Sequence, residues 1–228
     1  MDFMPHSFAS KAIKYFLDLS FPKEHPADIN FMNPYSEKET QKIVKQFYQK
    51  YFNDTKKRIF IFGINPGRFG GGITGISFTD PVALRDQCRI SNDLGNRKEL
   101  SSEFVYKVIN KFGGVKKFYS HFFLSALYPL AIIKNSKNYN YYDDSELLSF
   151  MKPLITESVK VQAQLGADKK FAVSFGKKNA KYLEQINSEL NIFNEIKVLD
   201  HPRYIMQYKR RKLDEYINKY LEMLSSFI

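Results

Sequence analysis

The chain has 228 residues, 43% of them hydrophobic, which is enough for one well-buried core and too few for two typical domains with a linker. Its 35 Lys and Arg against 24 Asp and Glu leave a formal net charge of +11, so a polyanion such as nucleic acid is the first partner to consider. The single cysteine, Cys88, excludes an intramolecular disulfide and a four-cysteine zinc or iron–sulfur site. We expect no metal, no other cofactor, and a cytoplasmic, reducing environment.

The N-terminal segment "MDFMPHSFAS" lacks the apolar stretch of a signal peptide, and no run approaches the roughly 20 apolar residues of a membrane span. We therefore expect no membrane contact. Helical patterns at about 7–19 and 37–52 are expected to pack on the core of a single domain covering residues 1–228, in which residues 1–54 add N-terminal helices.

Four short and nearly continuous apolar runs predict strands that are covered on both faces, as in a parallel sheet. Helical patterns alternate with them, so the sequence predicts an α/β fold with three layers, α/β/α, around a central four-stranded parallel sheet. The expected strands are 58–64, 121–127, 170–176 and 195–200. The expected helices are about 99–112, 144–165, 177–190 and 206–226, with a polar loop at 139–144 and a short helix opened by Pro81 behind Thr79 or Asp80.

Ligands of open α/β sheets bind outside the carboxyl ends of the strands, which directs attention to the residues after 64, 127, 176 and 200. The first of these ends is "GINPGRFGGGITGISF" (63–78), with six glycines in sixteen residues. A phosphate-binding P-loop would end in Gly-Lys-Ser or Gly-Lys-Thr, and here there is no lysine. The glycine spacing of a dinucleotide-binding turn is not kept either, so both phosphate-binding interpretations are disfavoured.

The last strand end reads "LDHPRY", in which His201 is followed by Pro202. A residue before proline favours an extended or turn conformation, so we expect the chain to turn away here and to leave His201 at the rim of the sheet. Adjacent residues on a strand point to opposite faces, and we therefore do not expect Asp200 to pair with His201.

The stretch 63–78 resembles the first motif of the single-strand-selective monofunctional branch of the uracil-DNA glycosylase superfamily, and "DHPRY" resembles the His-Pro start of its second motif. The likeness runs from about residue 55 through nearly the whole remaining chain. The matching positions of the first motif are Gly63, Asn65, Pro66, Gly67, Phe69, Gly70, Thr74, Gly75 and Phe78.

The resemblance implies a DNA glycosylase that hydrolyses the N-glycosidic bond of uracil and so initiates base excision repair. In that family Asn65 would orient the attacking water, and an amide does this by accepting and donating hydrogen bonds although it is a poor base. His201 would donate a hydrogen bond to the base oxygen on which charge develops. Both are expected to be catalytic.

Further residues are implied in substrate binding. Phe78 would stack on the flipped base, whereas for Phe69 packing in the core and contact with the base are equally open. Ala126 stands where the family carries an asparagine that reads the uracil edge, and Ser125 beside it would replace part of that function. Gly71 stands where the family often has Met, which favours a roomier pocket that also admits xanthine or hypoxanthine. The complete expected set is Gly63, Ile64, Gly67, Phe69, Gly71, Phe78, Ser125 and Ala126.

DNA contacts are expected around the same rim. The segment after His201 departs from the family pattern, and which of its residues inserts into DNA stays open; an apolar or aromatic wedge is physically reasonable. Lysines at the start of the helix at 177–190 would meet phosphates, although a solvated helix face would look identical. The expected DNA-binding residues are Pro66, Lys177, Lys178, Pro202, Arg203, Tyr204, Ile205, Lys209 and Arg210.

Two other functions remain open at this stage. One is a non-catalytic protein that binds DNA or abasic sites on the same fold, and the other is a nucleotide-dependent enzyme that uses the glycine loop for phosphate. No lysine lies inside either motif to serve as an amine nucleophile, which favours a monofunctional hydrolase. We expect a monomer that acts on single- or double-stranded DNA containing a deaminated base.

Overall fold

A computed structural model describes residues 6–22 and 24–228 of the protein. At its centre lies a four-stranded parallel sheet with the strand order β3-β2-β6-β7. The strands are β2 (Arg58–Gly63), β3 (Phe122–Ala126), β6 (Ala167–Phe175) and β7 (Glu195–Leu199). All six residues of β2 are buried, as expected of a central strand covered on both faces. The four predicted strands and the predicted α/β fold class are confirmed.

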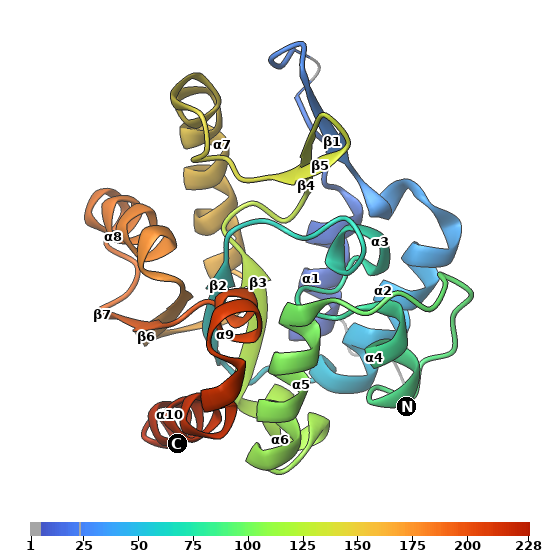
Figure 1. Ribbon diagram of the computed structural model, residues 1–228, viewed down its shortest axis with the longest axis vertical. Helices are drawn as coiled ribbons and strands as arrows, with labels where there is room; N and C mark the ends of the chain where they lie inside the picture. Colours follow the sequence, from blue (N-terminus) through green and yellow to red (C-terminus); the bar gives the residue numbers. More distant parts are fainter. Residues whose placement is uncertain (1–5, 23) are drawn as a thin grey trace.

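Helices cover both faces of this sheet (Figure 1). The ring of Phe122 in β3 contacts Phe112 edge-on and Phe118 at a tilt, and Tyr220 packs against Phe175 of β6. Phe8 packs against Phe60 and Phe123. The helices are α1 (Phe8–Leu17), α2 (Lys38–Phe52), α3 (Gly71–Thr74), α4 (Pro81–Asp86), α5 (Leu100–Phe112), α6 (Val115–His121), α7 (Ser145–Ala163), α8 (Lys177–Leu190), α9 (Pro202–Tyr208) and α10 (Leu213–Ser225).

Local chemistry explains several helix ends. Pro81 occupies the first turn of α4 behind Asp80, whose carboxylate accepts a hydrogen bond from the Ala83 amide at 2.8 Å, so Asp80 is the cap. Asp144 caps α7 in the same way.

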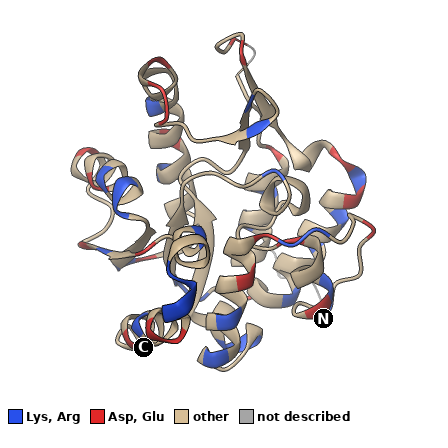
Figure 2. Ribbon diagram, viewed as in Figure 1, with Lys and Arg blue, Asp and Glu red and all other residues tan. Residues whose placement is uncertain are grey.

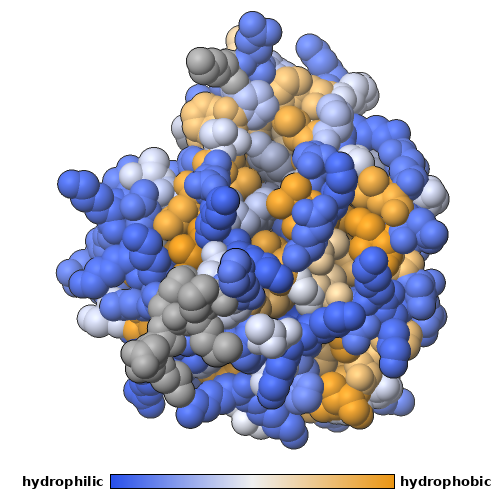
Figure 3. All heavy atoms as spheres, turned by 180° about the vertical axis from the view of Figure 1, so that it is seen from behind, coloured by the Kyte–Doolittle hydropathy of each residue, from blue (hydrophilic) through white to orange (hydrophobic). Residues whose placement is uncertain are grey.

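On the face opposite to that of Figure 1, hydrophilic side chains predominate and apolar ones emerge in small groups (Figure 3), because the large apolar residues pack inside the layers.

A second sheet was not predicted. It is antiparallel, with the order β1-β4-β5, and is built from β1 (Ile29–Met32), β4 (Ala131–Lys134) and β5 (Lys137–Tyr139). Asn135 and Ser136, with φ of 49° and 58°, connect β4 to β5 in the left-handed conformation that two-residue hairpins require. Because β5 is short and polar, its sequence reads as a loop, and pairing with β4 makes it a strand.

The C-terminal region also differs from the prediction. Instead of one helix at 206–226, the chain forms α9, a 3₁₀ turn at Arg210–Lys212, and α10. Pro202 does not turn the chain away but opens α9, because the fixed φ of proline suits the first turn of a helix. His201 keeps the extended conformation expected before proline and becomes the cap of α9. No helix in the described part of the chain combines the length and the apolar character needed to cross a membrane.

Candidate active site

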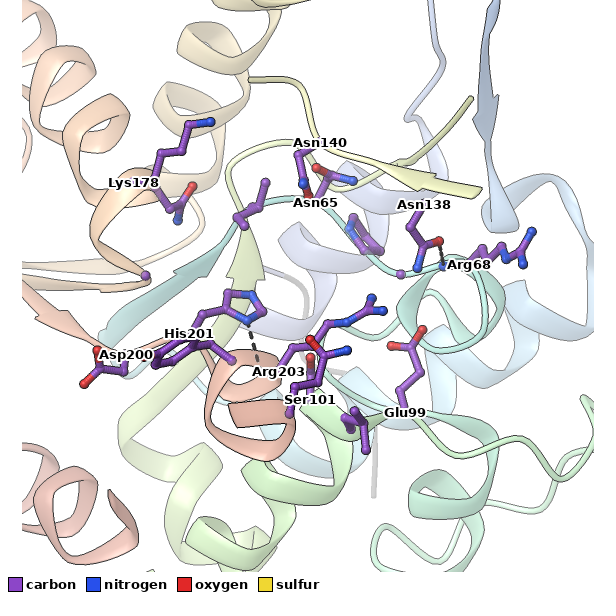
Figure 4. A pocket seen from close by; sticks show the side chains of 18 of the residues that line it. Asn65, Arg68, Glu99, Ser101, Asn138, Asn140, Lys178, Asp200, His201 and Arg203 are labelled. Atoms are coloured by element: carbon purple, nitrogen blue, oxygen red, sulfur yellow. Dashed lines mark hydrogen bonds between the residues drawn. The ribbon is translucent and has the colours of Figure 1, made fainter. Parts of the chain in front are cut away.

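A cavity of about 1020 Å³ lies at the carboxyl edge of the parallel sheet, where the sequence predicted a ligand site. Residues that follow β2, β6 and β7 form much of its wall. The β4–β5 hairpin, the start of α5 and the outer face of α9 complete it (Figure 4). The predicted site residues that line it are Ile64, Asn65, Pro66, Gly67, Phe69, Lys177, Lys178, His201, Arg203 and Tyr204.

Asn65 lies two residues beyond β2, and its amide has a defined orientation. Its Nδ2 donates a hydrogen bond to the carbonyl of Tyr139 at 3.0 Å, across to β5. Its Oδ1 is buried and has no hydrogen-bond partner among the described residues. A buried polar atom without a partner is costly and rare, so this oxygen is poised to accept a hydrogen bond from water or a ligand.

His201 lines the cavity from the end of β7 (Figure 4). Its Nδ1 accepts a hydrogen bond from the backbone N–H of Arg203 at 3.1 Å. The neutral ring therefore carries its proton on Nε2, which leaves that nitrogen as a donor. Burial, and then the nearby charge of Arg203, lower the pKa of His201 to about 4, so the ring is neutral at physiological pH. The carboxylate of Asp200 accepts a hydrogen bond from Lys219 at 3.2 Å, so its partner is this lysine and not His201.

Glu99 was missed by the sequence analysis. It stands just before α5, lines the cavity, and accepts a hydrogen bond from the Phe69 amide at 3.3 Å. Burial raises the pKa of its carboxyl, while the amides of the glycine loop and the charge of Arg203 act in the opposite direction. Figure 4 shows Glu99, just before α5, and Arg203, on α9, turned toward one another. No motif marks Glu99, because its partners are backbone amides thirty residues away in sequence.

Three glycines of the loop pack closely against side chains of the chain itself. A Cβ at Gly67 or Gly70 would lie 2.9 or 2.5 Å from Oε2 of Glu99, which leaves room for hydrogen alone. At Gly63 a Cβ would clash with the ring of Phe78, whose Cζ is the nearest atom. These glycines thus accept close approach by side chains of this chain itself. Gly63 and Gly71 are buried outside the cavity lining.

The two phenylalanines of the loop lie in different surroundings. Phe78 has a φ of 55° and packs edge-on against Phe175, with ring centroids 5.1 Å apart, beside the ring of His201 at 6.3 Å. It is outside the cavity lining, and stacking on a base stays a prediction. The ring of Phe69 lies at the cavity wall, with the guanidinium groups of Arg68 and Arg97 4.4 and 4.1 Å from its centroid.

Ser125 and Ala126 do not reach the cavity. Both are buried, and the Ser125 hydroxyl donates a hydrogen bond to Oε1 of Gln162 on α7. The amide of Gln162 in turn donates to the carbonyl of Ala126 at 3.0 Å. The expectation that Ser125 replaces the missing base-reading amide is therefore at odds with the geometry, because the hydroxyl is already hydrogen-bonded to Gln162 of α7.

The basic residues divide into two groups. Lys178 extends over the ring of Tyr142, with its Nζ 4.1 Å from the centroid, at the start of α8. Lys209 and Arg210 lie beyond α9, outside the cavity lining, and Arg210 approaches Glu103 at 3.9 Å. Figure 2 shows Lys and Arg gathered on the segment between α9 and α10. Pro202 and Ile205, also expected to meet DNA, are buried.

Within the described residues, no group of three or more His, Cys, Asp or Glu side chains is arranged to hold a metal ion. The polar chemistry of the cavity is therefore that of amides, one neutral imidazole, carboxylates and cationic side chains on its wall.

A family model described as "Uracil DNA glycosylase superfamily" matches residues 49–225. The chain belongs to this superfamily. It is also similar to a solved structure, wild-type SMUG2 of Pedobacter heparinus, with 41% sequence identity and a TM-score of 0.92 over 97% of this chain and 98% of that one. A search among curated proteins found no match. The resemblance inferred from the two motifs is confirmed, and the chain is a DNA glycosylase, a hydrolase of N-glycosyl bonds whose partner is DNA.

Proposed function

We propose that this glycosylase excises uracil from DNA with Asn65 and His201 as its catalytic residues, and that its pocket also admits the larger deaminated bases xanthine and hypoxanthine. The observation that carries the proposal is the pairing, in one cavity, of an unpartnered amide oxygen with a neutral imidazole donor. Membership of the superfamily and the likeness to SMUG2 support the reaction class.

The reaction needs a water held at the sugar and stabilisation of a departing base. Because Nδ2 of Asn65 is engaged by Tyr139, its Oδ1 accepts a hydrogen bond from the attacking water. The water oxygen bonds to C1′ as the C1′–N bond breaks, and the electron pair of that bond leaves with the base. The surplus water proton passes to solvent, since an amide does not take it.

His201 acts on the other product. Its Nε2–H donates a hydrogen bond to the base oxygen on which negative charge develops, and removing one such donor typically costs 10²- to 10³-fold in rate. A pKa of about 4 keeps the ring neutral, so His201 stabilises the base anion as a hydrogen-bond donor and does not have to transfer its proton. The bond from the Arg203 amide maintains this tautomer before the substrate arrives.

The breadth of base selection follows from the wall of the cavity. Ser125 and Ala126, at the position where the family reads the uracil edge, are closed off by Gln162. A Cβ at Gly71 would meet Pro66 and the carbonyl of Ile76 at 3.2 Å, so the space for a purine comes from the size of the cavity and not from this glycine. With fewer groups that require one base edge, discrimination between deaminated bases is weaker.

The test is base release from single-stranded and duplex oligonucleotides that contain uracil, xanthine or hypoxanthine, detected as alkali-dependent strand cleavage, with cytosine and adenine oligonucleotides as negative substrates. Asn65→Ala and His201→Ala should each lose most of the activity. Asn30→Ala, at an exposed asparagine of β1, and His121→Ala, at the end of α6, are the matched controls and should keep it. Strict uracil selectivity would refute the broad pocket.

A different outcome would favour the alternative function. If the wild type binds abasic and single-stranded DNA but releases none of the three bases, the chain is a DNA-binding module on the fold of an enzyme.

A further inference from the structure

The β4–β5 hairpin of the second sheet reaches across to the loop that follows β2 of the parallel sheet. Among the described residues, three hydrogen bonds join the two segments, and in each of them the loop donates and the hairpin accepts. Nδ2 of Asn65 donates to the carbonyl of Tyr139 at 3.0 Å. The backbone N–H of Arg68 donates to Oδ1 of Asn138 at 3.0 Å (dashed line in Figure 4), and the Arg68 guanidinium donates to the carbonyl of Ser136. The hairpin thus contacts the loop at the proposed catalytic amide and three residues beyond it.

The hairpin is itself fixed to the body of the protein. Tyr139 pairs with Ile132 of β4, which is fully buried, and β4 pairs with β1 on its other side. Lys134, also on β4, forms ion pairs with Asp28 at 2.7 Å and with Asp144, the cap of α7, at 3.7 Å. The backbone of a paired strand has little freedom to move, so Tyr139 presents its carbonyl at a defined position.

This carbonyl decides which end of the Asn65 amide serves the cavity. A carbonyl oxygen accepts hydrogen bonds and donates none, so Nδ2 faces Tyr139 and Oδ1 is left as the free acceptor, buried and without a partner among the described residues. With the amide turned over, two acceptor oxygens would face one another, and an amino group would stand where the water needs an acceptor. An ionised aspartate at this position meets the same obstacle, because both of its oxygens are acceptors.

Asn138 holds the same loop from an exposed position on β5. Its Oδ1 accepts from the Arg68 amide, and the next amide of the loop, that of Phe69, is bonded to Glu99 at 3.3 Å. Two consecutive amides after the proposed catalytic residue are therefore each bonded to a side-chain oxygen from a distant element. Because the side chain of Asn138 is exposed, replacing it changes the support of the loop with little effect on the packing of the core.

We propose that the β4–β5 hairpin positions the catalytic amide. The Tyr139 carbonyl makes position 65 specific for asparagine, and Asn138 is a positioning residue that acts through the Arg68 amide. The inference rests on the proposed function, because it requires Asn65 to orient the attacking water. Without the bond to Asn138 the loop shifts, and a displaced acceptor holds the water out of line with the sugar carbon that it attacks.

The first experiment measures uracil release in a single turnover with saturating enzyme, so that the rate does not depend on binding. A second readout is affinity for an oligonucleotide that contains a stable tetrahydrofuran abasic analogue, measured by fluorescence anisotropy. The variants are Asn138→Ala and Asn138→Asp. Asn30→Ala is the matched control, because Asn30 is an exposed asparagine on β1, the other edge strand of the same sheet. Thermal unfolding of each variant checks the fold.

We expect Asn138→Ala to lower the rate about fivefold, the equivalent of one ordinary hydrogen bond, and to keep its affinity for the abasic analogue within about twofold. Asn138→Asp should keep the rate within about twofold, since a carboxylate still accepts from the Arg68 amide. Asn30→Ala should behave like the wild type. A rate in Asn138→Asp as low as in Asn138→Ala would show that this acceptor does not position the loop.

The second experiment compares Asn65→Asp with Asn65→Ala. A carboxylate is a stronger base than an amide, yet we expect Asn65→Asp to release uracil at least about tenfold more slowly than the wild type, because an ionised carboxylate faces the Tyr139 carbonyl. For the same reason Asn65→Asp should unfold at a lower temperature than Asn65→Ala at neutral pH. An aspartate variant as active as the wild type, or more stable than the alanine variant, would show that the carbonyl does not select an amide.

The same set of proteins separates this proposal from the function it rests on. If Asn65→Ala loses uracil release and Asn138→Ala keeps the wild-type rate, the positioning role is wrong and the proposed function stands. If Asn138→Ala loses affinity for the abasic analogue by the same factor as it loses rate, Asn138 contacts DNA directly and is not a positioning residue. If Asn65→Ala keeps the wild-type rate, the proposed function itself is wrong.

Discussion

The loop at residues 63–78 and helix α9 both follow strands of the parallel sheet and both border the cavity, yet they are used in opposite ways. The loop is turned inward, with Gly67 and Gly70 against Glu99 and Gly63 against Phe78. Helix α9 keeps two tyrosines in solvent. The inward-turned loop fixes the position of Asn65, whereas α9 combines a fixed histidine with a surface open to a partner.

The largest effect is expected on replacing His201, the cap of α9 and a proposed catalytic residue. His201→Ala should lower the rate of base release about 10²- to 10³-fold, because the donor to the departing base is lost. Binding to an oligonucleotide with a stable tetrahydrofuran abasic analogue should change by less than about threefold, because the analogue has no base to accept the hydrogen bond from His201. Single-turnover kinetics and anisotropy measure the two quantities. Equal losses of binding and rate would contradict the proposed role of His201 in the departure of the base.

A second change tests the inward packing of the loop. In Gly70→Ala the added methyl group meets the carboxylate of Glu99, and we expect roughly 1–3 kcal/mol of lost folding stability together with slower base release. Adding Glu99→Ala to this variant should restore part of the stability and part of the rate, because it removes the carboxylate that the new methyl group meets. Denaturant unfolding of the two single variants and the double variant gives the coupling energy. Additive effects would show that Glu99 and the loop do not depend on each other.

The pH dependence of stability tests the environment of His201. Its pKa is about 4 in the folded chain and about 6.5 in an unfolded one, so between these values the unfolded chain binds a proton that the folded chain does not. Lowering the pH from 6.5 toward 4 therefore destabilises the fold through this residue, by roughly 1–2 kcal/mol at pH 5, and above pH 7 the contribution is constant. In His201→Asn this part of the decline should disappear. An identical decline in wild type and variant would mean that the ring titrates normally.

The smallest expected effect belongs to the cationic border of α9. Arg211→Ala should weaken binding to single-stranded DNA a few-fold and reduce the slope of log K against log salt by about 0.7, the value for one phosphate contact on a single strand. A salt titration of binding measures this slope, and an unchanged slope in Arg211→Ala would show that this arginine does not contact a phosphate.

Several features of this protein were determined by the sequence alone. The buried strands could be predicted because parallel strands covered on both faces need unbroken apolar runs. Asn65 and His201 each lie two residues beyond such a strand, and their expected roles came from the resemblance of the two motifs. Motif spacing was sufficient to identify the superfamily, since the first motif forms one continuous segment with few conformational alternatives.

Tertiary structure decided the rest. Glu99 joins the site through backbone amides of a distant loop, β5 becomes a strand by pairing with β4, and Ser125 is lost to the site because Gln162 of α7 takes its hydroxyl. The tautomer of His201 likewise depends on Pro202 opening a helix whose Arg203 amide meets Nδ1. Each of these facts rests on a hydrogen-bond partner, in the backbone or in a side chain, that local sequence patterns do not encode, because the partner is chosen by packing in space.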